Sequence, residues 1–231
     1  MDYYILSLLF IPVLLFTIYA NIHVNSTYRK YQKHASVRGI TGSQAAQYVL
    51  RANNIADVDI CCIPGTMTDH YDPRNNTINL SKDVYHGSSI SAIGIACHEA
   101  GHAMQHANGY LPVKIRTALV PITNIGAKCS GLLIGAGLLL AYFGAQMLII
   151  AELGVLLFSL STIFQLVTLP TEFNASYRAL KYIRNTNILS DAEIKGAQKV
   201  LSAAALTYVA ALAVSLLDLL RLISLVNRRK D

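Results

Sequence analysis

Residues 127–169 read AKCSGLLIGAGLLLAYFGAQMLIIAELGVLLFSLSTIFQLVTL, and this stretch decides the fold. It is about twice as long as the ~20 apolar residues that one helical membrane crossing requires. The only charged side chains within residues 118–170 are Lys128 and Glu152, so this part cannot provide the charged surface of a water-soluble domain. We therefore predict an integral membrane protein in which residues 127–169 form a helical hairpin that turns near residues 144–146.

Apolar segments also lie towards both ends of the chain. Residues 4–20 suffice for one crossing, and basic residues follow rather than precede them, which indicates a retained anchor with its N-terminus outside the cytoplasm. Residues 200–226 are apolar apart from Asp218 and Arg221, and we favour a fourth membrane helix there. The alternative is an interfacial or re-entrant helix, because a fourth crossing places the basic tail at 228–230 outside. Three to four transmembrane helices are therefore expected.

The composition supports the membrane assignment and limits the partners. Apolar residues make up 53% of the chain and charged residues 14%, with a formal net charge of +6. The basic residues lie mostly beside apolar segments rather than among aromatic residues, which favours contact with an anionic lipid surface. We predict a lipid bilayer as partner and no nucleic acid, and the sequence makes no prediction of oligomeric state.

The segment before the hairpin is mixed in polarity and is typical of a globular domain. Thr41 and Gln44 form a capping box that opens a helix. Ser88 or Ser89 caps a second, longer helix, which Gly109 ends. Turn residues between two short strand-like segments predict a β-hairpin. The expected elements are a helix over residues 41–54, a strand over 58–63, hairpin strands over 66–71 and 77–81, and a helix from about 88 to 108.

The second of these helices contains His98-Glu99-Ala100-Gly101-His102, which matches H-E-x-x-H. Residues at positions i and i+4 stack on one helical face with Cβ atoms ~6 Å apart, so both imidazoles can bind one metal ion. Zinc binds neutral imidazole nitrogen at ~2.0–2.1 Å. Glu99 is placed to take a proton from a water molecule and to pass it to a leaving amine. The motif predicts a zinc metalloendopeptidase, with Zn2+ as cofactor and a membrane or membrane-proximal polypeptide as substrate.

A third zinc ligand on the same helix is excluded. A metzincin needs Gly at position 105 and His at position 108, but the sequence has Gln105 and Asn108. His106 lies ~12 Å along the helix axis from His98, so both cannot bind one ion on a straight helix. The remaining ligand must come from elsewhere in the chain.

Elimination among the glutamates leaves Glu172 as the third ligand. Glu152 is expected on the far side of the bilayer, and Glu193 has a sufficient role in a capping box at the start of the last helix. The two predicted crossings between His102 and Glu172 return both residues to the same membrane face. We therefore predict metal ligands at His98, His102 and Glu172.

Five further side chains are candidates for contacts to the substrate or the transition state. An edge of the hairpin, residues 66–71 or 77–81, could hold an extended peptide by adding it as a strand. Four side chains have suitable hydrogen-bond donors, and His106 is a polar neighbour of the site. The five candidates are His70, Tyr71, His106, Tyr177 and Arg178.

These motifs resemble the bacterial neutral zinc metallopeptidase family of YugP-like membrane proteins. The resemblance covers nearly the whole chain and rests on residues 26–28 (STY), 41–42 (TG), 68–74 (TDHYDPR), 98–106 (HEAGHAMQH) and 172–176 (EFNAS). It implies zinc at His98 and His102, catalysis by Glu99, and Glu172 as the downstream ligand of a gluzincin-like site. HtpX-like and CAAX-prenyl-type membrane proteases are similar more distantly. They carry Glu-x-x-x-Asp, whereas position 176 here is Ser.

The predicted fold is mainly α and integral to the membrane, with a zincin-like metallopeptidase domain and a small β-hairpin or sheet. The protein is expected in the cell membrane as a multi-pass protein whose active site faces the cytoplasm. The expected domains are an anchor (1–22), a cytoplasmic zincin-like domain (23–126), a transmembrane hairpin (127–169), a cytoplasmic segment with the third ligand (170–200), and a C-terminal membrane helix with a basic tail (201–231).

Two alternatives to this function stay open. An intramembrane protease of the site-2 type would take its third ligand from a distal Asp, for which Asp218 in Leu217-Asp218-Leu219 is the candidate. A non-catalytic membrane scaffold would carry a structural zinc, which usually has four protein ligands. Removing Asp218 and Glu172 separately distinguishes the first alternative, and removing Glu99 distinguishes the second.

Overall fold

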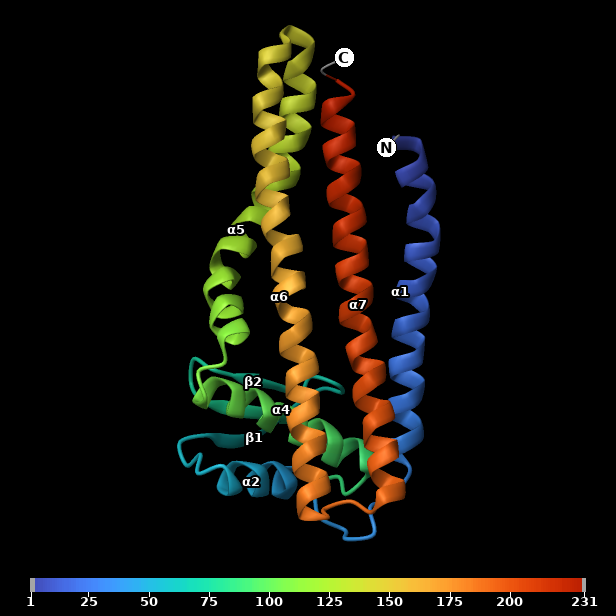
Figure 1. The fold of residues 1–231 in the computed structure, drawn as a ribbon, viewed down its shortest axis with the longest axis vertical. Helices are drawn as coiled ribbons and strands as arrows, with labels where there is room; N and C mark the ends of the chain where they lie inside the picture. Colours follow the sequence, from blue (N-terminus) through green and yellow to red (C-terminus); the bar gives the residue numbers. More distant parts are fainter. Residues whose placement is uncertain (1–2, 230–231) are drawn as a thin grey trace. The chain divides into compact units, whose positions relative to one another are not determined.

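The computed structural model describes residues 3–229, and most of them are helical (Figure 1). The elements in chain order are α1 (Tyr3–Gln32), α2 (Gly42–Ala52), β1 (Asp59–Ile63), β2 (His70–Asp72), β3 (Thr77–Ser81), α3 (Lys82–Tyr85), α4 (Ile90–Ala107), α5 (Leu111–Leu140), η1 (Ala141–Phe143), η2 (Ala145–Met147), α6 (Leu148–Thr186) and α7 (Asp191–Asn227). The prediction of a mainly α fold with one small sheet is confirmed.

The chain divides into two compact units. The site unit comprises Ala20–Val113 and Pro170–Leu206. The apolar unit comprises Met1–Tyr19, Lys114–Leu169 and Thr207–Asp231. Lys230 of the predicted basic tail lies outside the described residues.

Two of the long helices run further into polar sequence than predicted. α5 begins at Leu111 rather than near Ala127, and α6 continues through Pro170, whereas α7 begins at Asp191 as the predicted capping box requires. A change from apolar to polar side chains marks the end of a lipid-compatible surface, but it does not interrupt the backbone hydrogen bonds of a helix. Domain boundaries drawn from polarity alone therefore fall inside helices.

The apolar unit contains the parts of the chain suited to a bilayer. Four helices among residues 3–229 are long and apolar enough to cross a membrane: α1, α5 with η1, η2 with α6, and α7. The turn between α5 and α6 lies where the sequence predicts it. Small residues let these two helices approach closely, because a Cβ on Gly137 would overlap the backbone of Ala151. The chain is a membrane protein with four candidate transmembrane helices.

The sheet of the site unit has the strand order β1-β3-β2. β1 pairs in parallel with β3, whereas β2 pairs antiparallel to it, with His70 opposite Asn79. The predicted hairpin is present, although its first strand begins at His70 rather than Thr66. The prediction that residues 77–81 could form a free edge is wrong, because β3 is the central strand. A substrate strand could therefore add only at β1 or β2.

Local capping signals fix the helices around the sheet. Thr41 Oγ1 accepts a hydrogen bond from the Gln44 backbone N–H, and Gln44 Oε1 accepts one from the Thr41 N–H. Ser89 Oγ accepts a hydrogen bond from the Ala92 N–H at the start of α4. α4 ends just before Gly109, which has a φ of 61°. Both predicted helix starts are confirmed, and the helix that carries the H-E-x-x-H motif is defined at each end.

Candidate metal centre

The buried face of α4 determines where the motif side chains lie. Ile93, Cys97 and Ala100 are fully buried in the core of the site unit. His98 and His102 are partly exposed and lie one turn apart on a neighbouring face of the helix. Packing of the apolar face therefore presents both imidazoles on the same side of α4.

Glu172 of α6 meets the two histidines. Its Oε2 lies 3.3 Å from His98 Nε2 and 3.4 Å from His102 Nε2, and the two nitrogens lie 3.2 Å apart. Glu172 itself is 2% exposed. The structure thus brings together the three side chains that elimination selected from the sequence.

The triangle of donor atoms fits a zinc ion. Tetrahedral zinc with bonds of ~2.0–2.1 Å has ~3.3 Å between neighbouring ligand atoms. The three observed separations of 3.2, 3.3 and 3.4 Å match this value. Two imidazoles and one carboxylate are also the donor set of catalytic zinc sites that keep their fourth position open.

Gly101, inside the motif, permits the close approach of α4 and α6. A Cβ at this position would lie 2.7 Å from the carbonyl oxygen of Ala175, which belongs to a fully buried residue. A larger side chain would push the helices apart, and the histidines would move away from Glu172. The geometry of the centre therefore depends on this helix contact as well as on the ligands.

Two side chains that the sequence reasoning did not assign contact the imidazole rings. Ser176 Oγ lies 3.1 Å from His98 Nδ1, and Gln105 Oε1 lies 3.0 Å from His102 Nδ1. Donation from Nδ1–H to these oxygens leaves each Nε2 available to a metal and fixes the ring orientation. Position 176 is where the distant relatives carry Asp, so a hydroxyl here stands in place of a carboxylate. Gln105 could have been found from its i+3 spacing to His102 on the same helix face.

Gln105 also connects α4 to α6. The residue is fully buried, and its Nε2 donates to the Thr171 carbonyl oxygen at 2.8 Å and to Asn174 Oδ1 at 3.1 Å. Arg178 Nε donates to the same Asn174 oxygen at 2.7 Å. One glutamine thus orients a ring of the metal centre and holds the helix that carries Glu172.

Replacing Gln105 with alanine is expected to weaken zinc binding about 10–100-fold, because the His102 ring loses its acceptor. Competition with a zinc chelator, using the purified full chain, measures the change. Gln198→Ala removes an exposed glutamine from α7 and serves as the matched control. Wild-type zinc affinity in Gln105→Ala would contradict the proposed support of His102.

Glu99 lies on α4 beside β2 and is 7% exposed. Burial raises the pKa of its carboxyl group to about 7, although the charge of His98 and a hydrogen bond from the backbone of Tyr71 act in the opposite direction. A carboxyl group with a pKa near neutrality both accepts and releases a proton readily at physiological pH. Glu99 thus differs from Glu172: it lies beside the donor triangle rather than in it, and its pKa is close to neutrality.

In the metal-free protein, Glu99→Gln is expected to raise the free energy of unfolding by about 3 kcal/mol at about pH 8. The folded protein holds the Glu99 proton more tightly than the unfolded chain does. This group therefore favours folding at pH below about 4.5, and the contribution is lost as the pH rises through about 7. Glutamine stays neutral, so the difference between variant and wild type should vanish at about pH 4. Chemical denaturation in the presence of a chelator, at both pH values, measures it.

Glu193→Gln is the control for this stability experiment. The Glu193 carboxylate accepts hydrogen bonds from Ser190 N, Ser190 Oγ and the Val37 backbone N–H, each at 2.7–2.8 Å. Its replacement is expected to lower stability, since charge-assisted hydrogen bonds are lost. A Glu99→Gln protein that is less stable than wild type at pH 8 would show that burial does not raise the pKa of Glu99.

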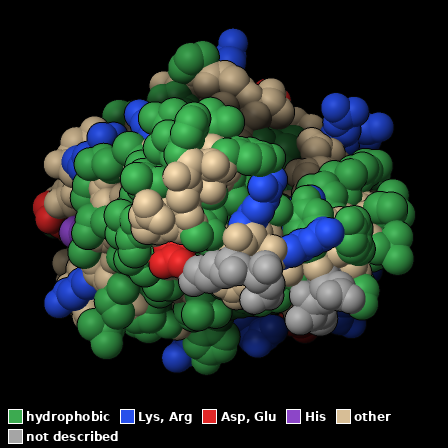
Figure 2. All heavy atoms as spheres, turned by 90° about the horizontal axis from the view of Figure 1, so that it is seen from above, with side chains coloured by type: hydrophobic (Ala, Val, Ile, Leu, Met, Phe, Trp, Pro, Cys, Tyr) green, Lys and Arg blue, Asp and Glu red, His purple; other side chains and the backbone are tan. Residues whose placement is uncertain are grey.

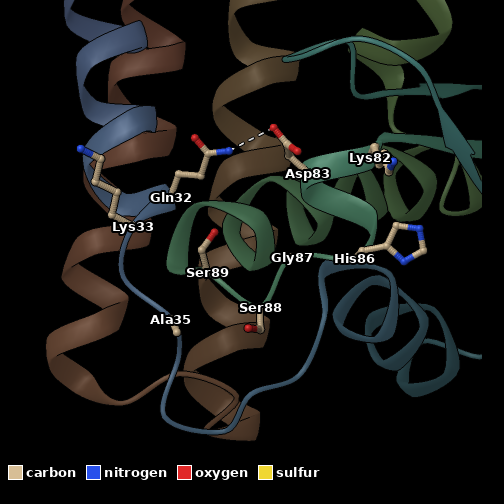
Figure 3. Close-up of a pocket in the computed structure, with 9 residues that line it drawn as sticks. All are labelled: Gln32, Lys33, Ala35, Lys82, Asp83, His86, Gly87, Ser88 and Ser89. Atoms are coloured by element: carbon tan, nitrogen blue, oxygen red, sulfur yellow. Dashed lines mark hydrogen bonds between the residues drawn. The ribbon is translucent and has the colours of Figure 1, made fainter.

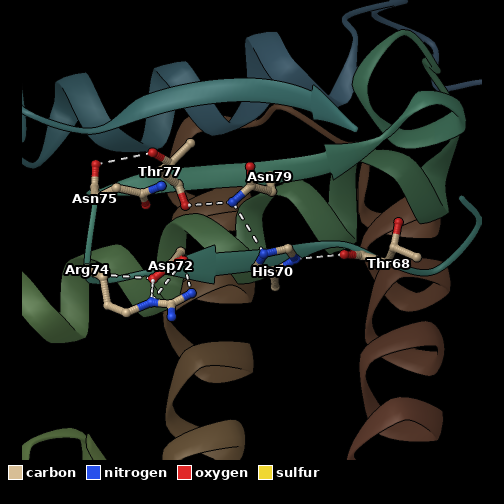
Figure 4. Close-up of polar contacts among 7 residues, drawn as sticks. All are labelled: Thr68, His70, Asp72, Arg74, Asn75, Thr77 and Asn79. Carbon is tan, nitrogen blue, oxygen red and sulfur yellow. Dashed lines mark hydrogen bonds and ion pairs between the residues drawn. The ribbon is translucent and has the colours of Figure 1, made fainter. Parts of the chain in front are cut away.

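His70 lies on the exposed side of the sheet. Its Nδ1 is 2.8 Å from the Thr68 carbonyl oxygen, and its Nε2 is 3.3 Å from Asn79 Nδ2 (Figure 4). In the neighbouring turn, Arg74 forms an ion pair with Asp72 at 2.6 Å. These contacts give His70 a local structural role and do not include the donor triangle.

The other predicted contacts are divided between β2, α4 and α6. The Tyr71 hydroxyl donates to Asn76 Oδ1 at 2.8 Å, and the Tyr71 ring lies 6.0 Å from that of His106, which is exposed. Tyr177 is 62% exposed, whereas Arg178 is bound to Asn174 as described above. None of these side chains belongs to the donor triangle. The Tyr71 backbone contact to Glu99 places the free edge of β2 beside the centre.

A cavity of about 540 Å³ in the site unit contains none of the predicted site residues (Figure 3). It is lined by the end of α1, by α3 and by the start of α4, where Gln32 Nε2 donates to Asp83 Oδ2 at 3.1 Å. The candidate metal centre is therefore identified from the distances between its donor atoms, and its three ligands do not line this cavity.

Asp218, the ligand that the site-2 alternative needs, belongs to the apolar unit. It forms an ion pair with Arg221 at 3.2 Å. Among residues 3–229, the group of side chains suited to a metal contains Glu172 and not Asp218. The donor geometry thus favours Glu172 as the third ligand.

Residues 6–227 match the family described as "Putative neutral zinc metallopeptidase". The chain belongs to this family. It is similar to the "Putative membrane protease YugP" of Bacillus subtilis (strain 168), with 44% identity over 213 residues, which is 92% of each chain. No solved structure matches. The predicted membership of the neutral zinc metallopeptidase family is confirmed.

Proposed function

We propose that this protein is a membrane-embedded zinc metalloendopeptidase that cleaves polypeptides at the cytoplasmic membrane face. The observation that carries the proposal is the zinc-sized triangle formed by donor atoms of His98, His102 and Glu172. The buried Glu99 beside it, with a pKa near neutrality, supports a hydrolytic rather than a structural role. Membership of the neutral zinc metallopeptidase family supports the same reaction class.

The residues of the centre would have two separate roles, zinc binding and proton transfer. His98, His102 and Glu172 would hold the zinc ion. Zinc at such a site supplies Lewis-acid chemistry, acidifying water and polarising a carbonyl group. Glu99 would take the proton of the attacking water on its carboxylate and pass it to the nitrogen of the leaving amine. The scissile C–N bond breaks as that nitrogen is protonated, which returns Glu99 to its ionised form.

The substrate would be an extended polypeptide. β2 is an edge strand that lies beside Glu99, and an extended peptide would add to it as a further strand. Backbone pairing recognises any extended chain, so membrane or membrane-proximal proteins with unfolded segments are suitable substrates. The basic residues that follow the first apolar segment (Arg29, Lys30, Lys33 and Arg38) favour a cytoplasmic position for the site unit.

Removal of the metal tests the proposal directly. Treatment of the purified full chain with a chelator is expected to abolish cleavage of an unfolded polypeptide, and added Zn2+ is expected to restore it. Magnesium should not substitute, because it prefers six oxygen ligands in octahedral geometry over imidazole nitrogen. Cleavage that persists in the metal-free protein would reject a zinc-dependent mechanism.

The two alternatives have less support. α4 is not among the four helices suited to cross a membrane within residues 3–229, which weighs against an intramembrane protease of the site-2 type. A structural zinc usually has four protein ligands, whereas the donor group among the described residues has three. A membrane scaffold also has no need for a carboxyl group with a raised pKa next to the metal.

A further inference from the structure

Arg221 of α7 is a charged residue within the apolar unit. Its Nη1 pairs with Asp218 Oδ1 at 3.2 Å, and its guanidinium carbon lies 4.9 Å from the Phe10 ring centroid and 6.0 Å from that of Tyr3. The Arg221 Nε is buried and has no hydrogen-bond partner among the described residues. Since aromatic faces cover a guanidinium without accepting its in-plane N–H groups, Arg221 keeps donors that these neighbours do not use.

Arg221 also lines a cavity of about 280 Å³. Its lining combines the Asp218–Arg221 pair with apolar and aromatic side chains: Tyr3, Phe158, Leu222 and Leu225 complete it. A guanidinium beside aliphatic and aromatic walls suits a ligand with a phosphate at one end and a hydrocarbon chain at the other. A free anion would use the guanidinium but not these walls.

Two more arginines near the same end of α7 lie against tyrosine rings. Arg228 is 4.9 Å from the ring of Tyr4, and Arg229 is 5.0 Å from the ring of Tyr142 and donates to its hydroxyl at 3.2 Å. Tyrosine and arginine together are typical of the level of the lipid head groups. Figure 2 shows a face of the molecule on which Lys and Arg side chains lie among hydrophobic ones.

We propose that the cavity at Arg221 binds an anionic phospholipid. Arg221 would donate to the phosphate, and one acyl chain would lie along Phe158, Leu222 and Leu225. Arginine is suited to this role because its planar guanidinium matches the geometry of phosphate oxygens. Asp218 shares the guanidinium with the phosphate and so limits the affinity. This site is separate from the metal centre and does not depend on the proposed peptidase activity.

Thermal unfolding of the full chain in nanodiscs tests the site. Adding phosphatidylglycerol to phosphatidylcholine nanodiscs is expected to raise the midpoint of unfolding of the wild type by about 3 °C. Arg221→Gln should lose most of this shift. Arg184→Gln removes an exposed arginine of the site unit and should keep it. An equal shift in Arg221→Gln, or the same shift from inorganic phosphate added to phosphatidylcholine nanodiscs, would overturn the proposal.

Asp218→Asn tests the proposal without removing the arginine. The variant leaves the whole Arg221 guanidinium to the phosphate, so the shift caused by phosphatidylglycerol should exceed that of the wild type. An unchanged or smaller shift contradicts the assignment. Zinc content should stay at the wild-type level in all three variants, which separates this result from any failure at the metal centre.

Discussion

Glu99→Gln is expected to slow cleavage of an unfolded polypeptide by about 10²–10⁴-fold, while zinc content stays at the wild-type level. Glutamine has the shape of glutamate but cannot take a proton from water at neutral pH. Because Glu99 is not one of the three donors that meet at the candidate zinc position, its replacement removes proton transfer and leaves binding in place. Parallel measurements of hydrolysis rate and bound zinc separate these two effects.

Glu152→Gln provides the matched control for this experiment. It makes the same chemical change at a glutamate of the apolar unit and should leave hydrolysis within a factor of about two, as is usual for a change away from the reacting groups. Equal activity in Glu99→Gln and the wild type would reject Glu99 as the general base. Loss of zinc from Glu99→Gln would instead show that Glu99 helps to bind the metal.

Glu172→Ala is expected to lower zinc affinity by about a thousandfold, and activity should fall with it. Zinc at protein sites of four ligands is bound with an apparent free energy of about 10–16 kcal/mol, or about 2.5–4 kcal/mol for each ligand, and the upper value corresponds to a change in affinity of about a thousandfold. Removal of Glu172 also leaves two imidazoles without the negative charge that faces them at 3.3 and 3.4 Å. Metal analysis after dialysis against a weak chelator gives the bound fraction.

Asp218→Ala distinguishes the competing ligand assignments. If Glu172 is the third ligand, zinc binding in Asp218→Ala should equal that of the wild type, because Asp218 is paired with Arg221 in the apolar unit. The opposite pattern, with zinc lost from Asp218→Ala and kept by Glu172→Ala, would support an intramembrane protease of the site-2 type. Loss from both variants would point to a defect in folding, which circular dichroism detects.

The features predicted correctly from the sequence depend on partners close together in the chain. Thr41 and Gln44 are three residues apart, as are Ser89 and Ala92, so the caps of α2 and α4 can be found from local spacing. The same applies to the two motif histidines on one helix. Glu172 was found differently, by counting crossings and by eliminating other glutamates. Its role as a metal ligand and the catalytic role of Glu99 stay predictions.

The features that escaped prediction depend on packing between distant segments. The parallel pairing of β1 with β3 makes β3 the central strand, and no local signal indicates which strands of a small sheet become neighbours. The contacts of Gln105 with α6 and of Ser176 with His98 likewise require the relative rotation of two helices. That rotation follows from side-chain packing, which periodicity alone does not reveal.

The contact between Gly101 and Ala175 has a consequence for how this protein can evolve. A single methyl group is the smallest addition that mutation can make to Gly101, and even that group would meet backbone rather than a movable side chain. A residue that touches no metal and transfers no proton should therefore be as intolerant of substitution as the histidines beside it. Surveys of natural variation that score only chemically reactive positions would overlook this one.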